Sequence, residues 1–485
     1  MLQTEHQKKS VLMKTVTVLI IIEAVLSIIV GIMALALGVI PGKYIAVLVA
    51  VLAIPIVLVV VARKWTTGRI LGCVLSAIMI VLLTLGGFYI YKTGSALGSI
   101  TDSKFEKFGV NAYVLKGDSA KTIEDAKNYT FGILKSLDRS NTDATIDKIN
   151  KELGVEIKTK EYSGVFELID ALMDKKVQAI IVNQGCINIT ADSEGYENTE
   201  SKISIIYSNE IKKDVEKPSS STKDEKKGIT KRCFVVYLSG IDTRGSTIIN
   251  TRSDVNILMV VNPMEKKILL VNTPRDFYVP LSISNGVRDK LTHAGIYGTE
   301  VSMDTMEMLY DVNIDYYVKV NFSSFVKIID ALGGVEVNSD YSFTSLEGFK
   351  YSKGVNKLNG TKALSFARER YAFSDGDRQR GKNQMAVISA VIDKATSPSI
   401  LKNYASLMDS IKGFMQTSLS SREIGDLVQM QLNDMASWEI SSVSVDGTGD
   451  SKTTYSNPGF KAYVMIPDQT TIDAAKNEIN TVMGK

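Results

Sequence analysis

Three apolar segments dominate the N-terminal part of the chain, and almost no charged residue interrupts them. They cover residues 14–40, 44–62 and 70–91, and each is long enough to cross a hydrocarbon core of roughly 30 Å. A cleaved signal peptide has a shorter apolar stretch and would not be followed by two more such segments. Buried helices of a soluble domain are the other alternative, which the scarcity of charges disfavours. We therefore predict three transmembrane helices within residues 14–92, after a cytoplasmic N-terminus of residues 1–13.

The charges that flank these segments predict their orientation, because excess Lys and Arg marks the cytoplasmic face of a membrane protein. Two basic residues flank one side and five flank the other, namely Lys43 and Lys92 against Lys8, Lys9, Arg63, Lys64 and Arg69. We therefore expect a multi-pass protein of the cell membrane with a cytoplasmic N-terminus and extracytoplasmic C-terminal domains. Glu23 lies within the first segment, where an ionisable side chain is a candidate functional group. A contact with a neighbouring helix is one alternative, and a side chain that extends towards the membrane surface is the other.

Residues 104–210 alternate between strand and helix periodicity. The pattern predicts strands and helices in turn at 128–134, 143–153, 155–157, 165–172 and 177–182. This is typical of a small parallel α/β unit, here called the accessory domain. Its cadence resembles one lobe of the type II periplasmic solute-binding proteins. A ligand-binding role and a spacer or docking role both remain open.

Residues 211–231 are rich in Lys, Asp, Glu and Ser and lack the apolar residues needed to fold. We predict a flexible linker there, so the domains on either side should fold separately. Residues 232–485 form the C-terminal domain. Its buried strands and amphipathic helices are predicted at 233–238, 257–262, 267–272, 301–310, 316–321, 323–332, 335–337, 358–368 and 383–394. The fold class is therefore α/β, and this domain should be an α/β/α sandwich with a mixed central sheet.

Composition removes several classes of function. A formal net charge of +3 over 485 residues gives no support for nucleic-acid binding. Cys186 and Cys233 flank the linker and lie in different predicted domains, which favours free thiols over a disulfide. Two histidines in the whole chain exclude a histidine-based metal site. We expect His293 to pack or hydrogen-bond as a neutral side chain, with a catalytic role as the alternative.

Two aspartates are candidates for holding a metal ion. Asp242 and Asp254 are twelve residues apart, and each lies in or beside a loop between strands. Both are expected at one end of the sheet, where ligand sites of such sheets lie. Mg²⁺ takes one or two protein carboxylates together with phosphate oxygens and water. The pair therefore predicts a site for Mg²⁺ or Mn²⁺, although aspartate also commonly caps turns.

Arginines gather in the same part of the sequence. Arg275 directly follows a predicted strand, Arg368 and Arg370 lie at a helix end, and Arg380 and Gln384 share one helix face. Arg368 and Arg370 can reach one site only if the helix ends between them. Arginine forks match phosphate oxygens, whereas solvated arginines near a helix C-terminus are the simpler alternative. The chain has no G-x-S-x-G motif and no P-loop, so we predict a pyrophosphate site that acts by positioning and charge stabilisation.

With these motifs, residues 234–397 resemble the LytR-CpsA-Psr family. The matching pieces occur in one order and are Gly240-Ile241-Asp242-Thr243-Arg244, Arg252-Ser253-Asp254-Val255-Asn256, Pro274-Arg275-Asp276, Leu358-Asn359-Gly360 with Arg368-Glu369-Arg370, and Asp377-Arg378-Gln379-Arg380 with Gln384. Membrane spans ahead of the domain also fit the family. Three spans and an inserted α/β domain are less usual there than a single span.

The resemblance implies a Mg²⁺-dependent phosphotransferase. Such proteins move a glycopolymer, of the teichoic acid or capsule type, from an undecaprenyl-pyrophosphate carrier in the membrane to a muramic-acid hydroxyl of peptidoglycan. It implies that Asp242 and Asp254 hold the metal, and that the pyrophosphate is held by Arg275, Arg368, Arg370, Arg380 and Gln384. Asp254 and Arg275 would be the catalytic residues, Asp254 by assisting deprotonation of the acceptor.

The resemblance also implies an apolar groove for the polyprenyl tail. Some relatives carry a second arginine four residues after the Pro-Arg arginine, where this chain has Val279. Two other functions remain open. One is a membrane-bound extracytoplasmic sensor or regulator. The other is a pyrophosphatase acting on the same lipid-linked glycans, because water and a sugar hydroxyl use the same site.

Overall fold

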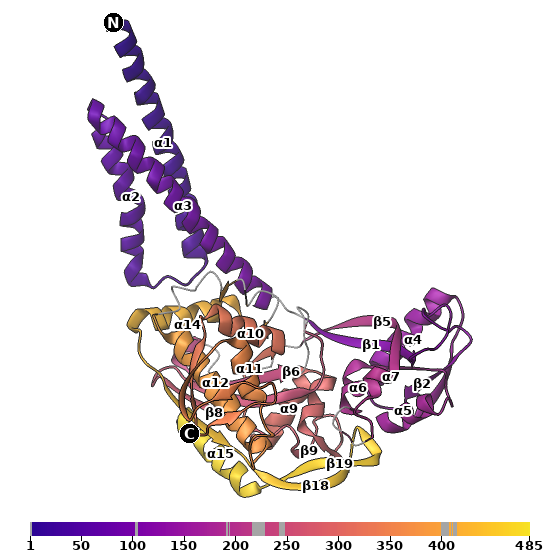
Figure 1. Ribbon diagram of the computed structural model, residues 1–485. Helices are drawn as coiled ribbons and strands as arrows, with labels where there is room; N and C mark the ends of the chain where they lie inside the picture. Colours follow the sequence, from indigo (N-terminus) through magenta and orange to yellow (C-terminus); the bar gives the residue numbers. More distant parts are fainter. Residues whose placement is uncertain are drawn as a thin grey trace.

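Three long apolar helices extend from one side of two folded domains in the computed structural model (Figure 1). The structure describes residues 2–101, 105–190, 193, 195–215, 228–241, 248–398, 407–408, 410 and 415–485. The helices are α1 (Leu2–Ala36), α2 (Ile45–Ala62) and α3 (Thr66–Thr101), with a 3₁₀ turn at Gly42–Tyr44. Each is long and apolar enough to cross a membrane, which agrees with the predicted anchor.

Glu23 makes an interhelical contact inside this bundle. Its side chain is buried, and Ser76 on α3 donates a hydrogen bond of 2.6 Å to Glu23 Oε2 on α1. The carboxyl group therefore faces a neighbouring helix, which was one of the alternatives to a functional role.

The accessory domain is a five-stranded sheet with helices on its faces. Its strand order is β3-β2-β4-β1-β5. Its elements are β1 (Phe105–Leu115), β2 (Thr130–Leu134), α4 (Arg139–Leu153), β3 (Lys158–Tyr162), α5 (Val165–Met173), β4 (Ala179–Asn183), α6 (Gln184–Thr190), α7 (Thr199–Lys202) and β5 (Ile203–Asp214). Strands β3, β2 and β4 are parallel as predicted, but β1 runs antiparallel to both β4 and β5. A wholly parallel unit was therefore a wrong prediction.

Two boundaries differ from the sequence prediction for physical reasons. Strand β3 begins at Lys158 rather than at Val155, and four of its five side chains are exposed, so no apolar alternation marks this edge strand. Strand β5 continues to Asp214 because residues 211–214 pair with β1. Those four residues therefore belong to the sheet and not to the predicted linker. Residues 216–227 of that segment lie outside the described residues, so a flexible linker there stays a prediction.

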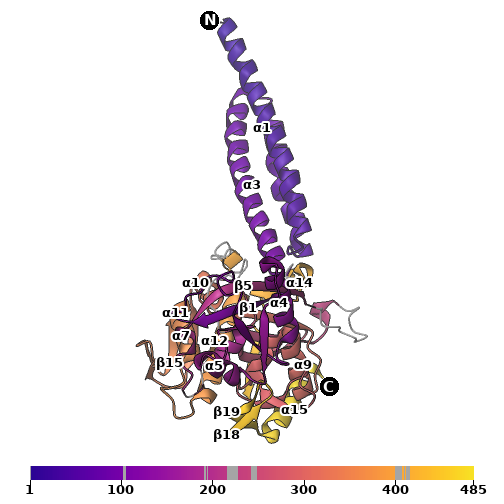
Figure 2. The same cartoon turned by 90° about the vertical axis from the view of Figure 1, so that its right-hand side faces the viewer.

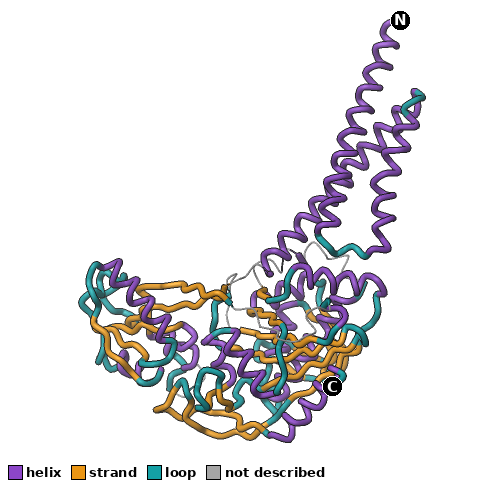
Figure 3. Tube along the Cα trace, turned by 180° about the vertical axis from the view of Figure 1, so that it is seen from behind, coloured by secondary structure: helices purple, strands orange, loops and turns teal. Residues whose placement is uncertain are grey.

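The C-terminal domain has a mixed six-stranded sheet in the order β16-β11-β6-β7-β8-β17. Its strands are β6 (Phe234–Ile241), β7 (Ser253–Asn262), β8 (Lys267–Thr273), β11 (Tyr316–Asn321), β16 (Met415–Thr417) and β17 (Glu439–Ser444). The pairs β6–β11 and β8–β17 are parallel, and the others are antiparallel. Seen from behind, the strands of the two outer domains form two separate sheets (Figure 3).

Helices cover both faces of this sheet, as the predicted α/β/α sandwich requires. Residues of α9 (Thr299–Tyr310) and α15 (Gln469–Met483) join one core with the side chains that point to one face. Residues of α12 (Asp377–Thr396) and α14 (Ser421–Asp434) pack on the other face. The smaller elements are β9 (Tyr278–Pro280), β10 (Arg288–Lys290), a 3₁₀ turn (Leu291–His293), α8 (Ala294–Tyr297), α10 (Phe322–Ala331), β12 (Val335–Ser339), β13 (Phe343–Thr344), β14 (Lys350–Tyr351), β15 (Gly354–Leu358), α11 (Gly360–Arg368), β18 (Gly447–Thr454) and β19 (Asn457–Pro467).

Local capping fixes where the helices near the site begin. The Asn321 side chain accepts a hydrogen bond from Ser324 N at the start of α10, and Asn359 accepts one from Lys362 N at the start of α11. Ser420 and Glu423 form a capping box on α14. Such caps satisfy the free N–H groups of a first turn and typically stabilise a helix by about 1 kcal/mol.

The accessory domain is docked onto the C-terminal domain through several contacts, and two of them involve hydrogen bonds. In the first, the β18–β19 hairpin reaches the accessory domain (Figure 1). Asn457 Oδ1 accepts hydrogen bonds from Val165 N and Phe166 N, at 3.0 and 3.4 Å, and Phe460 stacks on Phe166 with ring centroids 4.1 Å apart. A helix N-terminus offers unpaired N–H groups to a ligand or another acceptor. At α5 the C-terminal domain supplies that acceptor, which favours the docking role.

The second contact is a buried ion pair. Glu106 on β1 accepts a hydrogen bond of 2.6 Å from Lys319 Nζ on β11, and both side chains are almost fully buried. Asn250 joins them, since its Oδ1 accepts from Lys319 Nζ at 2.6 Å and its backbone N donates to Lys107 O at 2.8 Å. The two domains therefore share polar and apolar contacts, although their separate folding is not tested by the structure and stays a prediction.

Candidate functional site

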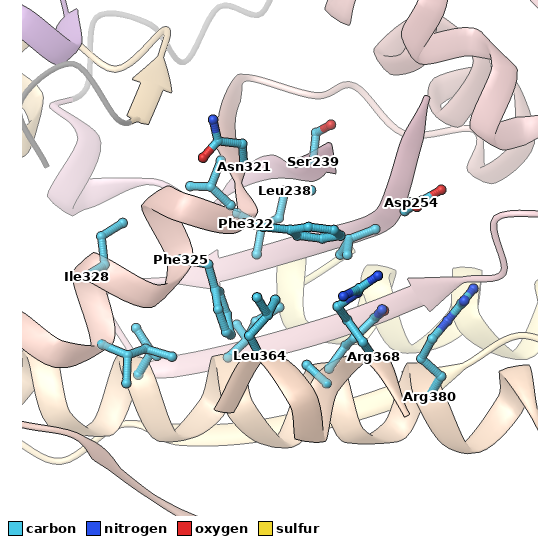
Figure 4. Close-up of a pocket in the computed structure, with 18 of the residues that line it drawn as sticks. Leu238, Ser239, Asp254, Asn321, Phe322, Phe325, Ile328, Leu364, Arg368 and Arg380 are labelled. Atoms are coloured by element: carbon cyan, nitrogen blue, oxygen red, sulfur yellow. The ribbon is translucent and has the colours of Figure 1, made fainter. Parts of the chain in front are cut away.

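A cavity of about 560 Å³ lies beside the central sheet of the C-terminal domain, between β6, β7 and β11 on one side and α10, α11 and α12 on the other. Most of its wall is apolar, with Leu238, Met259, Phe322, Phe325 and Leu364 among the lining residues. Figure 4 shows Asp254, Arg368 and Arg380 at one end of this cavity and Ile328 at the other. The cavity is therefore amphipathic, with an apolar body and a charged end.

Asp254 and Arg275 are paired at the charged end. Arg275 Nη1 donates to Asp254 Oδ1 at 2.9 Å, and Thr292 Oγ1 donates to the same oxygen at 3.3 Å. Burial alone would raise the pKa of Asp254, but Arg275, Arg252 and Arg380 outweigh it and hold that pKa well below its usual range. The carboxylate therefore stays ionised at any physiological pH.

Helix α12 brings Arg380 and Gln384 to the same end. The helix begins at Asp377, earlier than predicted, so both residues lie within it one turn apart. Arg380 Nη2 lies 2.5 Å from Asp377 Oδ1. Burial lowers the pKa of the Arg380 guanidinium from its usual value, because a buried positive charge is poorly solvated, and Asp377 partly offsets this. An arginine nevertheless keeps its charge in proteins.

Arg368 and Arg370 reach the cavity because α11 ends between them. Arg368 is the last residue of the helix, and Glu369 already has an extended backbone with φ −65° and ψ 131°. The helix therefore ends between the two arginines, as a shared site for both requires. Arg368 lies over the Phe322 ring at 4.5 Å from its centroid, and Arg370 lies over the Tyr371 ring at 4.6 Å. Contacts of this kind help to position a guanidinium, whose remaining N–H groups can donate to an anion.

The structure also brings in a residue to which the sequence argument gave no role. Arg252 is buried and lines the cavity next to Asp254. Its motif is one of those that resemble the family, but nothing in the sequence shows on which side of the strand its side chain lies. The cavity lining holds five arginines against the three carboxylates Asp254, Glu347 and Glu369, a formal net charge of +2. The charged end is therefore suited to a polyvalent anion.

The other residues singled out in the sequence analysis are Asp242, Val279, His293 and the two cysteines of the outer domains. Asp242 falls outside the described residues, so its place in the site stays a prediction. Val279 is buried in the core that includes α9 and α15, and it does not line the cavity. His293 is buried and hydrogen-bonded to Asp289 Oδ1 at 2.7 Å, outside the cavity lining, which agrees with the expected hydrogen-bonding role. Cys186 and Cys233 are both free thiols, as expected.

Asp276 pairs with Arg275 and with Lys290 next to the cavity. It lies 3.1 Å from Lys290 Nζ and 3.6 Å from Arg275 Nε. Burial would raise its pKa, but Lys290 and Arg275 hold it below its ordinary value. Arg275 is thus held between two ionised aspartates. Since it cannot leave this position without leaving a carboxylate unpaired, its guanidinium is already oriented before any anion arrives.

The donor set suits a divalent cation that also binds an anionic ligand. Within the described ranges, no group of three or more His, Cys, Asp or Glu side chains could hold a metal ion by itself. Among the described residues, the bonds from Arg275 and Thr292 both go to Asp254 Oδ1, so Oδ2 can serve a cation. Mg²⁺ needs only one or two carboxylates when phosphate oxygens complete its shell. Asp254 therefore fits that role, with Asp242 as the predicted partner.

Comparison with known proteins shows which family the chain resembles. The sequence pattern of the LytR_cpsA_psr family matches residues 199–481, more than half of the chain. The chain is 33% identical over 222 residues to the polyisoprenyl-teichoic acid–peptidoglycan teichoic acid transferase TagU of Enterococcus faecalis, which covers 45% of this chain and 72% of that protein. It is 34% identical over 210 residues to TagU of Bacillus subtilis, covering 43% and 67%.

Solved structures also match the chain. The crystal structure of B. subtilis TagV aligns with a TM-score of 0.44 and 26% identity, covering 52% of this chain and 98% of that one. A structure of TagT bound to LIIa-WTA aligns with a TM-score of 0.42 and 29% identity, covering 53% and 92%.

Proposed function

Since the chain belongs to the LytR-CpsA-Psr family, we propose that it is a phosphotransferase that attaches an undecaprenyl-pyrophosphate-linked glycopolymer, of the teichoic acid or capsule type, to peptidoglycan. The observation that carries this proposal is the amphipathic cavity. Its apolar body suits a polyprenyl tail and its arginine end suits a pyrophosphate. The TagU relatives are named for the same class of transfer.

The proposed reaction is a single phosphoryl transfer. A muramic-acid hydroxyl oxygen bonds to the phosphorus that carries the sugar, the bond from that phosphorus to the bridging oxygen breaks, and polyprenyl phosphate leaves with the electron pair. Arg275, Arg368, Arg370, Arg380 and Gln384 bind the pyrophosphate oxygens and offset the charge that grows on the leaving group. The fixed pairing of Arg275 with Asp254 and Asp276 means that little reorganisation is needed at that moment.

Asp254 is better suited to hold a cation than to take the acceptor proton. The depressed pKa of its carboxyl group makes it a weak base. With Asp242, it would hold Mg²⁺ or Mn²⁺ against the pyrophosphate, and the cation would supply further neutralisation of phosphate charge. The acceptor proton then passes to water or to the departing phosphate.

The anchor places this chemistry at the membrane surface. With the N-terminus in the cytoplasm, as the basic residues predict, both outer domains lie on the extracytoplasmic side, where peptidoglycan and the glycan of the lipid carrier are found.

The full chain in lipid vesicles, given a lipid-pyrophosphate glycan, Mg²⁺ and peptidoglycan fragments, tests the proposal by mass spectrometry of the products. Glycan phosphate joined to peptidoglycan, with polyprenyl phosphate released, supports transfer. Free glycan phosphate in the presence of the acceptor indicates a pyrophosphatase, and binding without turnover indicates a sensor. Either of the last two results contradicts the proposal.

A further inference from the structure

A second, smaller pocket lies next to the charged end of the large cavity. Its volume is about 180 Å³, and it is formed by residues just after β12 and in the connection from α11 to α12. The residues that line it include Tyr341, Ser342, Phe373, Ser374, Asp375 and Gln379. Ala372 also lines it and directly follows Tyr371 of the large cavity, while Gln379 directly precedes Arg380. Because consecutive Cα atoms are only about 3.8 Å apart, a group in this small pocket can be bonded to an anion at the charged end.

Two aromatic side chains line the small pocket. Phe373 is held by the aromatic core, since its ring centroid lies 4.7 Å from that of Phe343, which stacks on Tyr351. The Tyr341 ring lies 6.0 Å from that of Phe373, and Tyr341 is 51% exposed. The turn that carries it is fixed, because Ser339 Oγ donates to Tyr341 O at 2.7 Å. An exposed ring on a fixed backbone presents an apolar surface for the C–H face of a ligand.

The polar groups of the small pocket suit an uncharged ligand with several hydroxyl groups. Among the described residues, none pairs with the exposed Asp375 carboxylate. Ser342 Oγ accepts from Lys353 N at 2.9 Å, so its O–H can donate to a ligand. Gln379 Nε2 donates to Asn383 Oδ1 at 3.0 Å, which leaves the carbonyl oxygen of the Gln379 amide as an acceptor. No Lys or Arg is found among the described residues of the lining, so the chemistry disfavours an anion there.

The size and the place of the small pocket match one sugar ring. Pockets that enclose a drug-sized molecule have volumes of roughly 300–1,000 Å³, so about 180 Å³ fits a single ring and not an oligosaccharide. A sugar ring has hydroxyl groups around its edge and an apolar face of C–H groups, which these side chains complement. Strand β12 pairs with β15, and Figure 2 shows β15 farther from the membrane helices than α10 is. The pocket therefore belongs to a part of the domain that lies away from the bilayer.

We propose that the small pocket is a subsite for one uncharged sugar ring of the reacting saccharides, beside the arginines of the charged end. This inference rests on the proposed function for the presence of a sugar next to the phosphate. The first sugar of the glycopolymer and the sugar that carries the acceptor hydroxyl both have this chemistry, and both meet at the reacting phosphorus. Tyr341 covers the C–H face of the ring, and Asp375, Ser342 and Gln379 form hydrogen bonds with its hydroxyl groups.

Tyr341→Ala and Asp375→Ala test the subsite in the full chain in lipid vesicles. The probes are a lipid-pyrophosphate glycan, the same lipid pyrophosphate without a sugar, and a peptidoglycan disaccharide fragment. In each variant we expect the Kd of one saccharide probe to rise roughly tenfold. The Kd of the sugar-free lipid should be unchanged in Tyr341→Ala and no higher in Asp375→Ala, because removing a negative charge does not weaken the binding of an anion.

Two control variants should match the wild type with all three probes. Tyr341→Phe keeps the aromatic ring and loses only the hydroxyl group. Val355→Ala removes an equally exposed kind of apolar side chain from β15, outside the lining of both cavities, where Val355 is 67% exposed.

Weaker binding of the lipid-pyrophosphate glycan assigns the subsite to the glycopolymer, and weaker binding of the peptidoglycan fragment assigns it to the acceptor. Either result supports the subsite. Unchanged binding of both saccharide probes overturns it, and so does an equal loss that includes the sugar-free lipid, because the variants then disturb the arginines instead. Binding is measured apart from turnover, so a selective loss of saccharide binding in a chain that transfers no glycan contradicts only the proposed function. Transfer with wild-type KM values in both variants overturns the subsite alone.

Discussion

The Lys319→Met substitution should destabilise the junction between the accessory and C-terminal domains by about 3 kcal/mol, the lower end of the cost of removing one partner of a buried ion pair. Lys319 and Glu106 are 3% and 7% exposed, and Lys319 Nζ lies 2.6 Å from Glu106 Oε1. Methionine fills much of the same volume but leaves the carboxylate without its cation. Thr299 still donates to Glu106 from its backbone N at 3.1 Å and from its hydroxyl group, which keeps the cost at the lower end.

The pH dependence of this cost has a definite sign. Burial raises the pKa of Glu106, but Lys319 outweighs it, so the folded pKa lies below the ordinary value of 4.5. In the wild type this group contributes stability above pH 4.5, and that contribution is lost as the pH falls through the lowered folded pKa. Without Lys319, burial dominates and the pKa rises. The difference in stability between wild type and variant should therefore shrink as the pH falls.

Hydrogen exchange of the backbone amides of β1 and β11 in the full chain measures the local stability of this junction. A double variant, Glu106→Gln with Lys319→Met, removes both charges and should recover most of the loss. Glu210→Gln is the matched control on the neighbouring pair, because Lys107 and Glu210 are 24% and 41% exposed and such pairs contribute roughly 0.2–1 kcal/mol. The reasoning would be refuted if Lys319→Met lowered the local stability no more than the Glu210→Gln control does. It would also be refuted if the double variant were no more stable than Lys319→Met alone.

Three further predictions concern the site and the anchor. Asp254→Ala should abolish turnover in the product assay while the circular dichroism spectrum stays that of the wild type, and full wild-type activity in EDTA would reject a metal role. Arg275→Lys keeps the charge but loses the fork, so kcat/KM should fall roughly tenfold, or about 1.4 kcal/mol; unchanged kinetics would place Arg275 outside the phosphate site. A reporter fused after Lys92 should be active only outside the cytoplasm, and cytoplasmic activity would overturn the proposed function.

The sequence by itself determined the features that depend on local pattern. The three long apolar helices, the strands β6, β7 and β8, and helix α11 follow from hydrophobic period and length, whereas α12 begins at Asp377, before its predicted start. The charged motifs predicted a shared site for Asp254, Arg275, Arg368, Arg370, Arg380 and Gln384, and the structure places all six on one cavity. Their shared position could be predicted because it depends on side-chain chemistry and short motifs, whereas their roles stay predictions.

Only the tertiary structure decided what depends on distant contacts. The edge strands β16 and β17 come from the far C-terminal part of the chain, and their partners β11 and β8 lie much earlier, since Met415 pairs with Val320 and Glu439 pairs with Lys267. The apolar cavity has no local signature, because its wall comes from elements of both the sheet and the helices. Arg252 and Val279 show the limit most clearly. Arg252 faces the cavity, whereas Val279 faces the core. Packing between distant elements, rather than local sequence, sets the direction of each side chain.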